Sequence, residues 1–146
     1  MEIGAICGRN VVTIGRTGSI LDAARAMRTH HVGDVVVIDD DARPIGVITD
    51  RDIVVELVAK EVDLGSVAAS DVMSPTIATA EEGADLFETL RFMGVKGVRR
   101  LPVLDAAGRL AGILSVQDAM HVLLKELNFA SDVGTRQIER ERRTRA

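Results

Sequence analysis

Apolar positions along the chain alternate between two spacings. Helical spacing begins after Ser19 and again after Asp85, both of which are favourable N-cap residues. Each is followed by an apolar stripe: Ile20, Leu21, Ala24 and Met27 in the first case, and Leu86, Phe87, Leu90 and Met93 in the second. Runs of β-branched residues and leucine, typical of strands, occur twice in each half of the chain. They cover residues 35–38, 45–48, 101–104 and 110–114.

The flanking segments repeat the same order of elements. A short extended segment precedes each first helix, at residues 11–14 and 77–80. Acidic and small residues between the paired strands predict hairpin turns. A further apolar helix is predicted to close each half, at residues 50–60 and 116–127. The pattern therefore predicts the order β-α-β-β-α twice.

The two halves are copies of one another. At an offset of 66 residues, positions 11–54 align with 77–120 without a gap. Identical pairs include Thr13/Thr79, Arg25/Arg91, Met27/Met93, Val32/Val98, Val37/Val103, Asp39/Asp105, Gly46/Gly112 and Asp52/Asp118. Such agreement over apolar, glycine and acidic positions indicates an internal duplication.

A repeat of roughly 55 residues is too small to bury a sufficient core by itself. We therefore expect an α+β fold of α/β-like character, in which two β-α-β-β-α repeats pack sheet to sheet with pseudo-two-fold symmetry. Related clefts at the joint between repeats would be places for ligands. We expect the first repeat at residues 1–62, the second at 63–128, and a charged C-terminal tail at 129–146.

Composition narrows the class of protein. Apolar runs are too short to cross a bilayer, and the N-terminus lacks the basic and then apolar start of a signal peptide. The expectation is a soluble, cytoplasmic protein without membrane partners. Cys7 is the single cysteine and cannot form an internal disulfide framework. His30 and His31 have no companions at convincing ligand spacing, so no metal site is expected.

Charge is unevenly distributed. Residues 136–146 carry a net charge of +3, whereas the rest of the chain carries −7. An acidic body with no Trp, no Tyr and three Phe is unsuited to nucleic acid. The tail is interpreted as a solvated, fraying helix, with contact to an anionic partner as the alternative.

Two short motifs identify a family. They read GVITDRD at residues 46–52 and GILSVQD at residues 112–118, each at a junction from strand to helix. Together with VGDVVV at 32–37 and VRRLPV at 98–103, they resemble the tandem cystathionine-β-synthase (CBS) domain pair. The resemblance covers about residues 3–128. Thr49 with Asp52, and Ser115 with Asp118, also have the spacing of helix capping boxes, so capping alone could explain each motif.

The resemblance implies adenine-nucleotide sites that combine the two halves. The aspartate would hold ribose hydroxyls, and the Ser or Thr would face the sugar or phosphate. One cleft would combine Thr49, Arg51 and Asp52 with Ile77, Ala78, Val98, Arg99 and Arg100. The other would combine Ser115, Gln117 and Asp118 with Val11, Val12, Val32 and Gly33, and we place Asp34 there as well. The first copy is expected to lack the proline and helical lead-in that residues 73–75 give the second.

These observations predict a binding protein rather than an enzyme, because no nucleophile–base pair is evident. The leading hypothesis is a regulatory module that binds AMP, ADP, ATP or a related molecule, requires no cofactor and acts on an unidentified protein partner. Surplus apolar residues on the closing helices predict a homodimer. The alternative is a ligand-free dimeric scaffold that uses its helices and basic tail.

Overall fold

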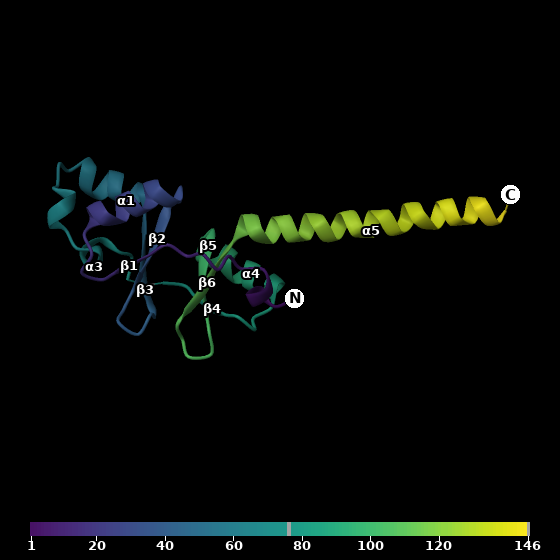
Figure 1. Cartoon of the computed structure of the whole chain (residues 1–146), viewed down its shortest axis with the longest axis horizontal. Helices are drawn as coiled ribbons and strands as arrows, with labels where there is room; N and C mark the ends of the chain where they lie inside the picture. The colour runs from purple at the N-terminus through teal and green to yellow at the C-terminus, as the bar shows by residue number, and fades with distance from the viewer. Residues whose placement is uncertain (76, 146) are drawn as a thin grey trace.

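The computed structural model describes residues 1–75 and 77–145. Two three-stranded sheets lie side by side, with helices around them and one long helix projecting from the body (Figure 1). The first repeat contains β1 (Thr13–Gly15), α1 (Ile20–His30), β2 (Asp34–Ile38), β3 (Pro44–Thr49), α2 (Asp50–Asp52) and a π-helix, η2 (Ile53–Val58). The second contains β4 (Ala80–Glu81), α4 (Leu86–Lys96), β5 (Arg100–Leu104), β6 (Leu110–Ser115) and α5 (Val116–Thr144).

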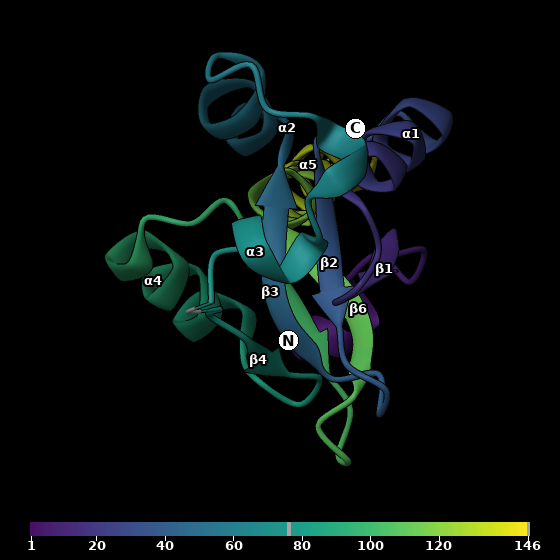
Figure 2. The same cartoon turned by 90° about the vertical axis from the view of Figure 1, so that its left-hand side faces the viewer.

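Both sheets have the same topology. In each, the first strand runs parallel to the second, and the second pairs antiparallel with the third. The registers are equivalent: Val36 pairs with Val47, and Pro102, 66 positions after Val36, pairs with Ile113. The two hairpin turns lie at the same end of the molecule (Figures 1 and 2). The predicted α+β fold of two equivalent repeats is confirmed.

The first helix of each repeat begins and ends at equivalent positions. The side chain of Ser19 accepts a hydrogen bond from the amide of Asp22 at 3.1 Å, and Asp85 caps α4 in the same way. Both helices end at a residue in the left-handed region, His31 (φ 53°) and Gly97 (φ 67°). The predicted N-caps are confirmed because a side-chain oxygen satisfies amides that the helix leaves free.

The prediction that the first copy lacks a helical lead-in is wrong. A 3-10 helix, η1 (Ile3–Ala5), stands where the second copy has α3 (Ala69–Val72), and a further 3-10 helix, η3 (Leu64–Ser66), precedes α3. The lead-ins are exchanged between the repeats. The amide of Gly8 donates to the carbonyl of Ile113 at 2.9 Å, and the amide of Ser74 donates to that of Val47. Each lead-in therefore contacts the third strand of the opposite half.

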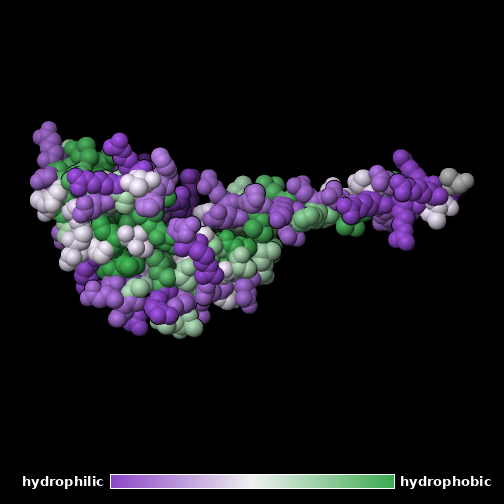
Figure 3. All heavy atoms as spheres, viewed as in Figure 1, coloured by the Kyte–Doolittle hydropathy of each residue, from purple (hydrophilic) through white to green (hydrophobic). Residues whose placement is uncertain are grey.

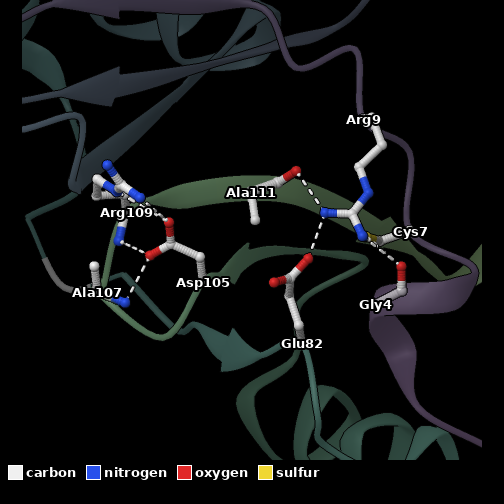
Figure 4. Close-up of polar contacts among 8 residues, drawn as sticks. All are labelled: Gly4, Cys7, Arg9, Glu82, Asp105, Ala107, Arg109 and Ala111. Carbon is white, nitrogen blue, oxygen red and sulfur yellow. Dashed lines mark hydrogen bonds and ion pairs between the residues drawn. The ribbon is translucent and has the colours of Figure 1, made fainter.

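Arg9 fastens the N-terminal lead-in to the second sheet (Figure 4). Its guanidinium donates to the Glu82 carboxylate, to the Ala111 carbonyl at 3.1 Å and to the Gly4 carbonyl at 2.7 Å. Three acceptors from separate segments hold this side chain in one place. In the same view, Asp105 closes the second hairpin turn by accepting the amides of Ala107 and Arg109.

The exchange of lead-ins determines the composition of the cores. Ile3 and Cys7 are buried with Leu86, Leu101 and other residues of the second repeat. Ala69 is buried with the first-repeat residues Ile20, Met27, Val35, Val37, Ile48, Ile53 and Leu57. Each core is thus completed by a segment from the other half, which makes the two repeats mutually dependent.

The closing helices differ from the prediction. The first is formed by α2 and η2 together and ends at Val58, two residues earlier than predicted. The second does not end at Leu127 but continues to Thr144, since the sequence contains no proline that would interrupt it. Among the described residues, no helix is both long and apolar enough to cross a membrane.

Candidate functional site

A cavity of about 570 Å³ lies where the two repeats meet. We call it the Thr49 cleft. This volume is typical of sites for small molecules. The first repeat contributes residues just before and at the start of β2, in β3 and at the start of α2. The second half contributes residues that precede β4 and residues just before and within β5. The lining residues are Gly33, Asp34, Val47, Thr49, Asp50, Arg51, Ser74, Ile77, Ala78, Val98, Arg99, Arg100 and Pro102.

The structure gathers most of the first predicted set in this cleft. Seven of its eight members line the cavity, and the exception is Asp52. Six lining residues lie outside that set: Gly33 and Asp34, which were assigned to the second cleft, and Val47, Asp50, Ser74 and Pro102, which were not predicted. Asp34 could have been found from the duplication, because it is equivalent to the predicted Arg100. Pro102 could have been found from strand periodicity, because residues two apart in a strand share a face.

Asp52 takes part in a capping box. Its Oδ2 accepts a hydrogen bond from the Thr49 amide at 3.0 Å, and Thr49 Oγ1 accepts one from the Asp52 amide at 3.1 Å. The capping interpretation of this motif is therefore correct at the level of geometry. Within the described part of the chain, the other oxygen, Oδ1, accepts no hydrogen bond. One carboxylate oxygen thus stabilises the turn and the other is available to a ligand.

Backbone contacts place the start of α2 against β2. The amide of Asp50 donates to the carbonyl of Gly33 at 2.9 Å. A Cβ on Gly33 would lie 3.1 Å from Asp50 Oδ2, so only a small residue fits here without displacing that side chain. The equivalent bond in the second repeat joins Val116 to Arg99 at 3.0 Å.

Charged side chains of both signs line the Thr49 cleft. Three are arginines, Arg51, Arg99 and Arg100, and two are aspartates, Asp34 and Asp50. Arg100 forms an ion pair with Asp34, whose side chain is 9% exposed, compared with 42% for Arg100. The side chains of Arg51 and Arg99 make no ion pair within the described residues. The cleft therefore holds two arginines free for an anion and a third occupied by a carboxylate.

The placement of Gly33 and Asp34 corrects the predicted grouping. Both were assigned to the second cleft, yet both line the Thr49 cleft. The reason is the symmetry of the joint: β2 and β5 begin close to the pseudo-two-fold axis, so their first residues meet. Asp34 faces the arginine that is its own counterpart in the other repeat.

The second predicted set has a different polar arrangement. Ser115 and Asp118 form the equivalent capping box, but Ser115 Oγ also donates to Asp118 Oδ2 at 2.5 Å. Val116 stands where the first repeat has Asp50, and Gln117 where it has Arg51. Gln117 is exposed, whereas Val11, Val12 and Val32 are half-buried. The other cavities that we describe lie beside α4 and along the end of α5.

Titratable groups with shifted pKa values lie outside the cleft. Burial raises the pKa of the Cys7 thiol, which makes it a poor nucleophile. A hydrogen bond from the N-terminal amino group, and then one from the Glu88 amide, lower the pKa of Asp85. Backbone and side-chain hydrogen bonds from Arg109 lower the pKa of Asp105. Among the described residues, no group of three or more His, Cys, Asp or Glu side chains is placed to hold a metal ion.

Fold and cleft define a module of two repeats with a ligand-sized cavity at their joint. The CBS domain model matches the chain twice, at residues 3–59 and 69–125, so the protein belongs to the CBS domain family.

Sequence relatives and solved structures resemble this chain over most of its length. An uncharacterized protein of Methanopyrus kandleri is 37% identical over 84% of this chain, which spans 62% of that relative. Hypoxic response protein 1 of Mycobacterium tuberculosis is 33% identical over 77% of this chain and 78% of its own. The crystal structure of Hypoxic Response Protein I, with two coordinated zinc ions, has a TM-score of 0.76 at 30% identity and covers 83% of this chain and 98% of that one.

A CBS domain protein of Pyrobaculum aerophilum has been solved in complex with AMP. It has a TM-score of 0.72 at 25% identity, and the match covers 81% of this chain and 89% of that one.

Proposed function

We propose that this protein is a regulatory module that binds an adenine nucleotide, AMP, ADP or ATP, in the Thr49 cleft. The observation that carries the proposal is a cavity built from both repeats, apolar on one part of its lining and rich in arginine on another. The AMP complex of the Pyrobaculum relative supports the ligand class. Binding between repeats would change their relative stability, and through it the affinity for a protein partner.

The lining residues suit the parts of a nucleotide. Val47, Ile77, Ala78 and Val98 offer apolar surface to the adenine ring. We assign Thr49 to the ribose side of the cleft, and we propose that the free oxygen of Asp52, which does not line the cavity itself, reaches a ribose hydroxyl, because a carboxylate accepts hydroxyl donors. Arg51 and Arg99 supply planar donors for phosphate oxygens. The second predicted set, around Ser115 and Asp118, is proposed as the weaker site, because Gln117 stands where the first repeat has Arg51 and supplies no cation to a phosphate.

Calorimetric titration with AMP, ADP, ATP, adenosine and GTP tests this proposal. We expect the adenine nucleotides to bind, with adenosine at least about tenfold weaker, because a hydrogen bond to a charged group contributes on the order of 1.5–3 kcal/mol. Arg99→Ala should weaken AMP binding. Arg91→Ala, an exposed arginine on α4 with the same loss of charge, is the matched control. The absence of heat or thermal shift with every nucleotide at millimolar concentration would refute the proposal.

We also propose a homodimer formed through the apolar surfaces of the body. Exposed large residues are found on η2 and at the start of α5, as predicted from the surplus on the closing helices. They are Val54, Val55, Val58, Met120, Leu124 and Leu127. Light scattering that returned a monomer mass at tens of micromolar would contradict this assembly. A ligand-free scaffold remains the second candidate function, favoured by the same exposed surfaces, and the nucleotide titration separates the two.

A further inference from the structure

The segment of α5 beyond the body exposes both apolar and charged residues. From Leu124 to Arg145 every residue is exposed, and in all of α5 only Ala119 is buried. Figure 1 shows the helix projecting away from both sheets, and Figure 3 shows apolar patches along it among charged side chains. Leu127 is 66% exposed and Ile138 is 55% exposed. A charged helix of this length is marginal without packing, so a surface that covers it would stabilise it.

One face of this segment has a symmetric pattern. Leu127, Ser131, Gly134 and Ile138 follow one another at intervals of four, three and four residues. At 100° per residue they fall within a sector of about 60°. The order large, small, small, large reads the same in both directions. Such a pattern matches itself when a second helix runs antiparallel, because Leu127 then lies opposite Ile138, and Ser131 opposite Gly134.

Nothing within a single protomer explains why a glycine stands at position 134. A Cβ built on it would have no atom within 4 Å, so neither a close contact nor a turn requires glycine there. Glycine inside a helix costs about 1 kcal/mol relative to alanine. Opposite Ser131 of a second helix, by contrast, glycine would let the two backbones approach closely.

The other apolar face is weaker. Phe129 and Val133 point to the opposite side of the helix, where Glu126, Arg136 and Arg140 interrupt the stripe. Charge also favours an antiparallel arrangement. The last eleven residues carry a net charge of +3, and antiparallel pairing keeps the two arginine-rich ends apart, whereas a parallel pair would place them side by side.

We propose that the α5 segment from Leu127 to Ile138 docks against the same segment of a second copy as an antiparallel helix pair centred between Ser131 and Gly134. This surface shares only Leu127 with the apolar body surface proposed above, and it is separate from the nucleotide proposal. Its geometry gives a specific test. Leu127 and Ile138 of different copies are opposite, whereas two copies of Leu127 lie about 16 Å apart along the axis at a rise of 1.5 Å per residue.

Disulfide trapping tests the pairing. Leu127→Cys and Ile138→Cys chains, both in a Cys7→Ala background, are mixed at about 100 μM and oxidised. We expect the mixed 127–138 disulfide to exceed either self-disulfide at least tenfold, because Cα atoms more than about 7 Å apart cannot be bridged. Phe129→Cys mixed with Arg136→Cys is the matched control: these positions are equally level in the antiparallel register but face away, so no disulfide is expected.

Two further measurements make each outcome decisive. Ile138→Asp, which leaves the body surface unchanged, should weaken dimerisation at least tenfold in sedimentation equilibrium and reduce helical circular dichroism, whereas Val133→Asp should do neither. A monomer at 100 μM, a self-disulfide at position 127, or a dimer without 127–138 trapping would each overturn the proposal. The last result would leave dimerisation through the body, and nucleotide binding, intact.

Discussion

Asp34 and Arg100 are equivalent positions of the two repeats, yet they carry opposite charges and form an ion pair across the joint. Each is the first residue of the central strand of its sheet, β2 for Asp34 and β5 for Arg100. The pseudo-symmetry brings these two equivalent positions together. Two aspartates or two arginines there would repel each other, whereas an aspartate and an arginine attract. Both residues line the Thr49 cleft, where an anionic ligand would compete with Asp34 for Arg100.

This competition predicts opposite effects of two substitutions. Asp34→Asn should tighten AMP binding several-fold, because it removes a negative charge and releases Arg100 to the phosphate. Arg100→Ala should weaken AMP binding by about tenfold or more, since it removes a charged hydrogen-bond donor and leaves the Asp34 carboxylate unpaired. Calorimetry measures both. Weaker binding by Asp34→Asn would show that the ion pair is needed to shape the cleft.

The two capping boxes should differ in function but not in stability. Asp52→Ala and Asp118→Ala each remove the side chain that returns to the N-cap amide, and each should lower the free energy of unfolding by roughly 1 kcal/mol. Only Asp52→Ala should weaken tight AMP binding, by at least about tenfold. Urea unfolding and calorimetry on the same samples separate the effects. If Asp118→Ala alone abolished tight binding, the clefts would be assigned the wrong way round.

The exchanged N-terminal lead-in should be sensitive to Gly112. A Cβ at this position would lie 2.7 Å from Cys7 Sγ and 2.9 Å from the Gly8 carbonyl oxygen. Because one of these atoms is backbone, Gly112→Ala should displace the lead-in and lower stability by about 1–3 kcal/mol. Gly83→Ala, where a Cβ meets nothing within 4 Å, is the control. Equal unfolding midpoints for the two variants would contradict the close packing described here.

Stability should decrease in acid partly through Asp85. Hydrogen bonds from the N-terminal amino group and from the Glu88 amide lower its pKa, so the folded state favours the carboxylate. The resulting stabilisation is fully present above the ordinary aspartate pKa of about 4 and is lost as the pH falls through the lower folded value. Asp85→Asn should flatten the pH dependence of unfolding in this range. Ser19→Asn changes the equivalent, uncharged N-cap and should leave the pH dependence unaltered.

Local patterns were sufficient to predict much of this molecule. The β-α-β-β-α order, the N-caps at Ser19 and Asp85 and the hairpin turns all depend on residues close together in the sequence, and comparison of the two halves showed the duplication. Spacing and side-chain chemistry determine such features directly. Seven of the eight residues grouped with Thr49 also line one cavity, because the family resemblance identifies positions that the repeats bring together.

Contacts between distant segments were decided only by the tertiary structure. The exchange of the two lead-ins depends on which sheet leaves room beside Gly46 or Gly112, and neither glycine identifies its neighbour in sequence. The assignment of Asp34 to the Thr49 cleft depends on how near β2 and β5 begin to the symmetry axis. The length of α5 has a different origin: its residues beyond Leu127 favour a helix, although those that the structure describes, up to Arg145, are all exposed. The sequence therefore determined the repeats and their elements, while the tertiary structure decided how each repeat completes the other, because packing between remote segments has no local signature.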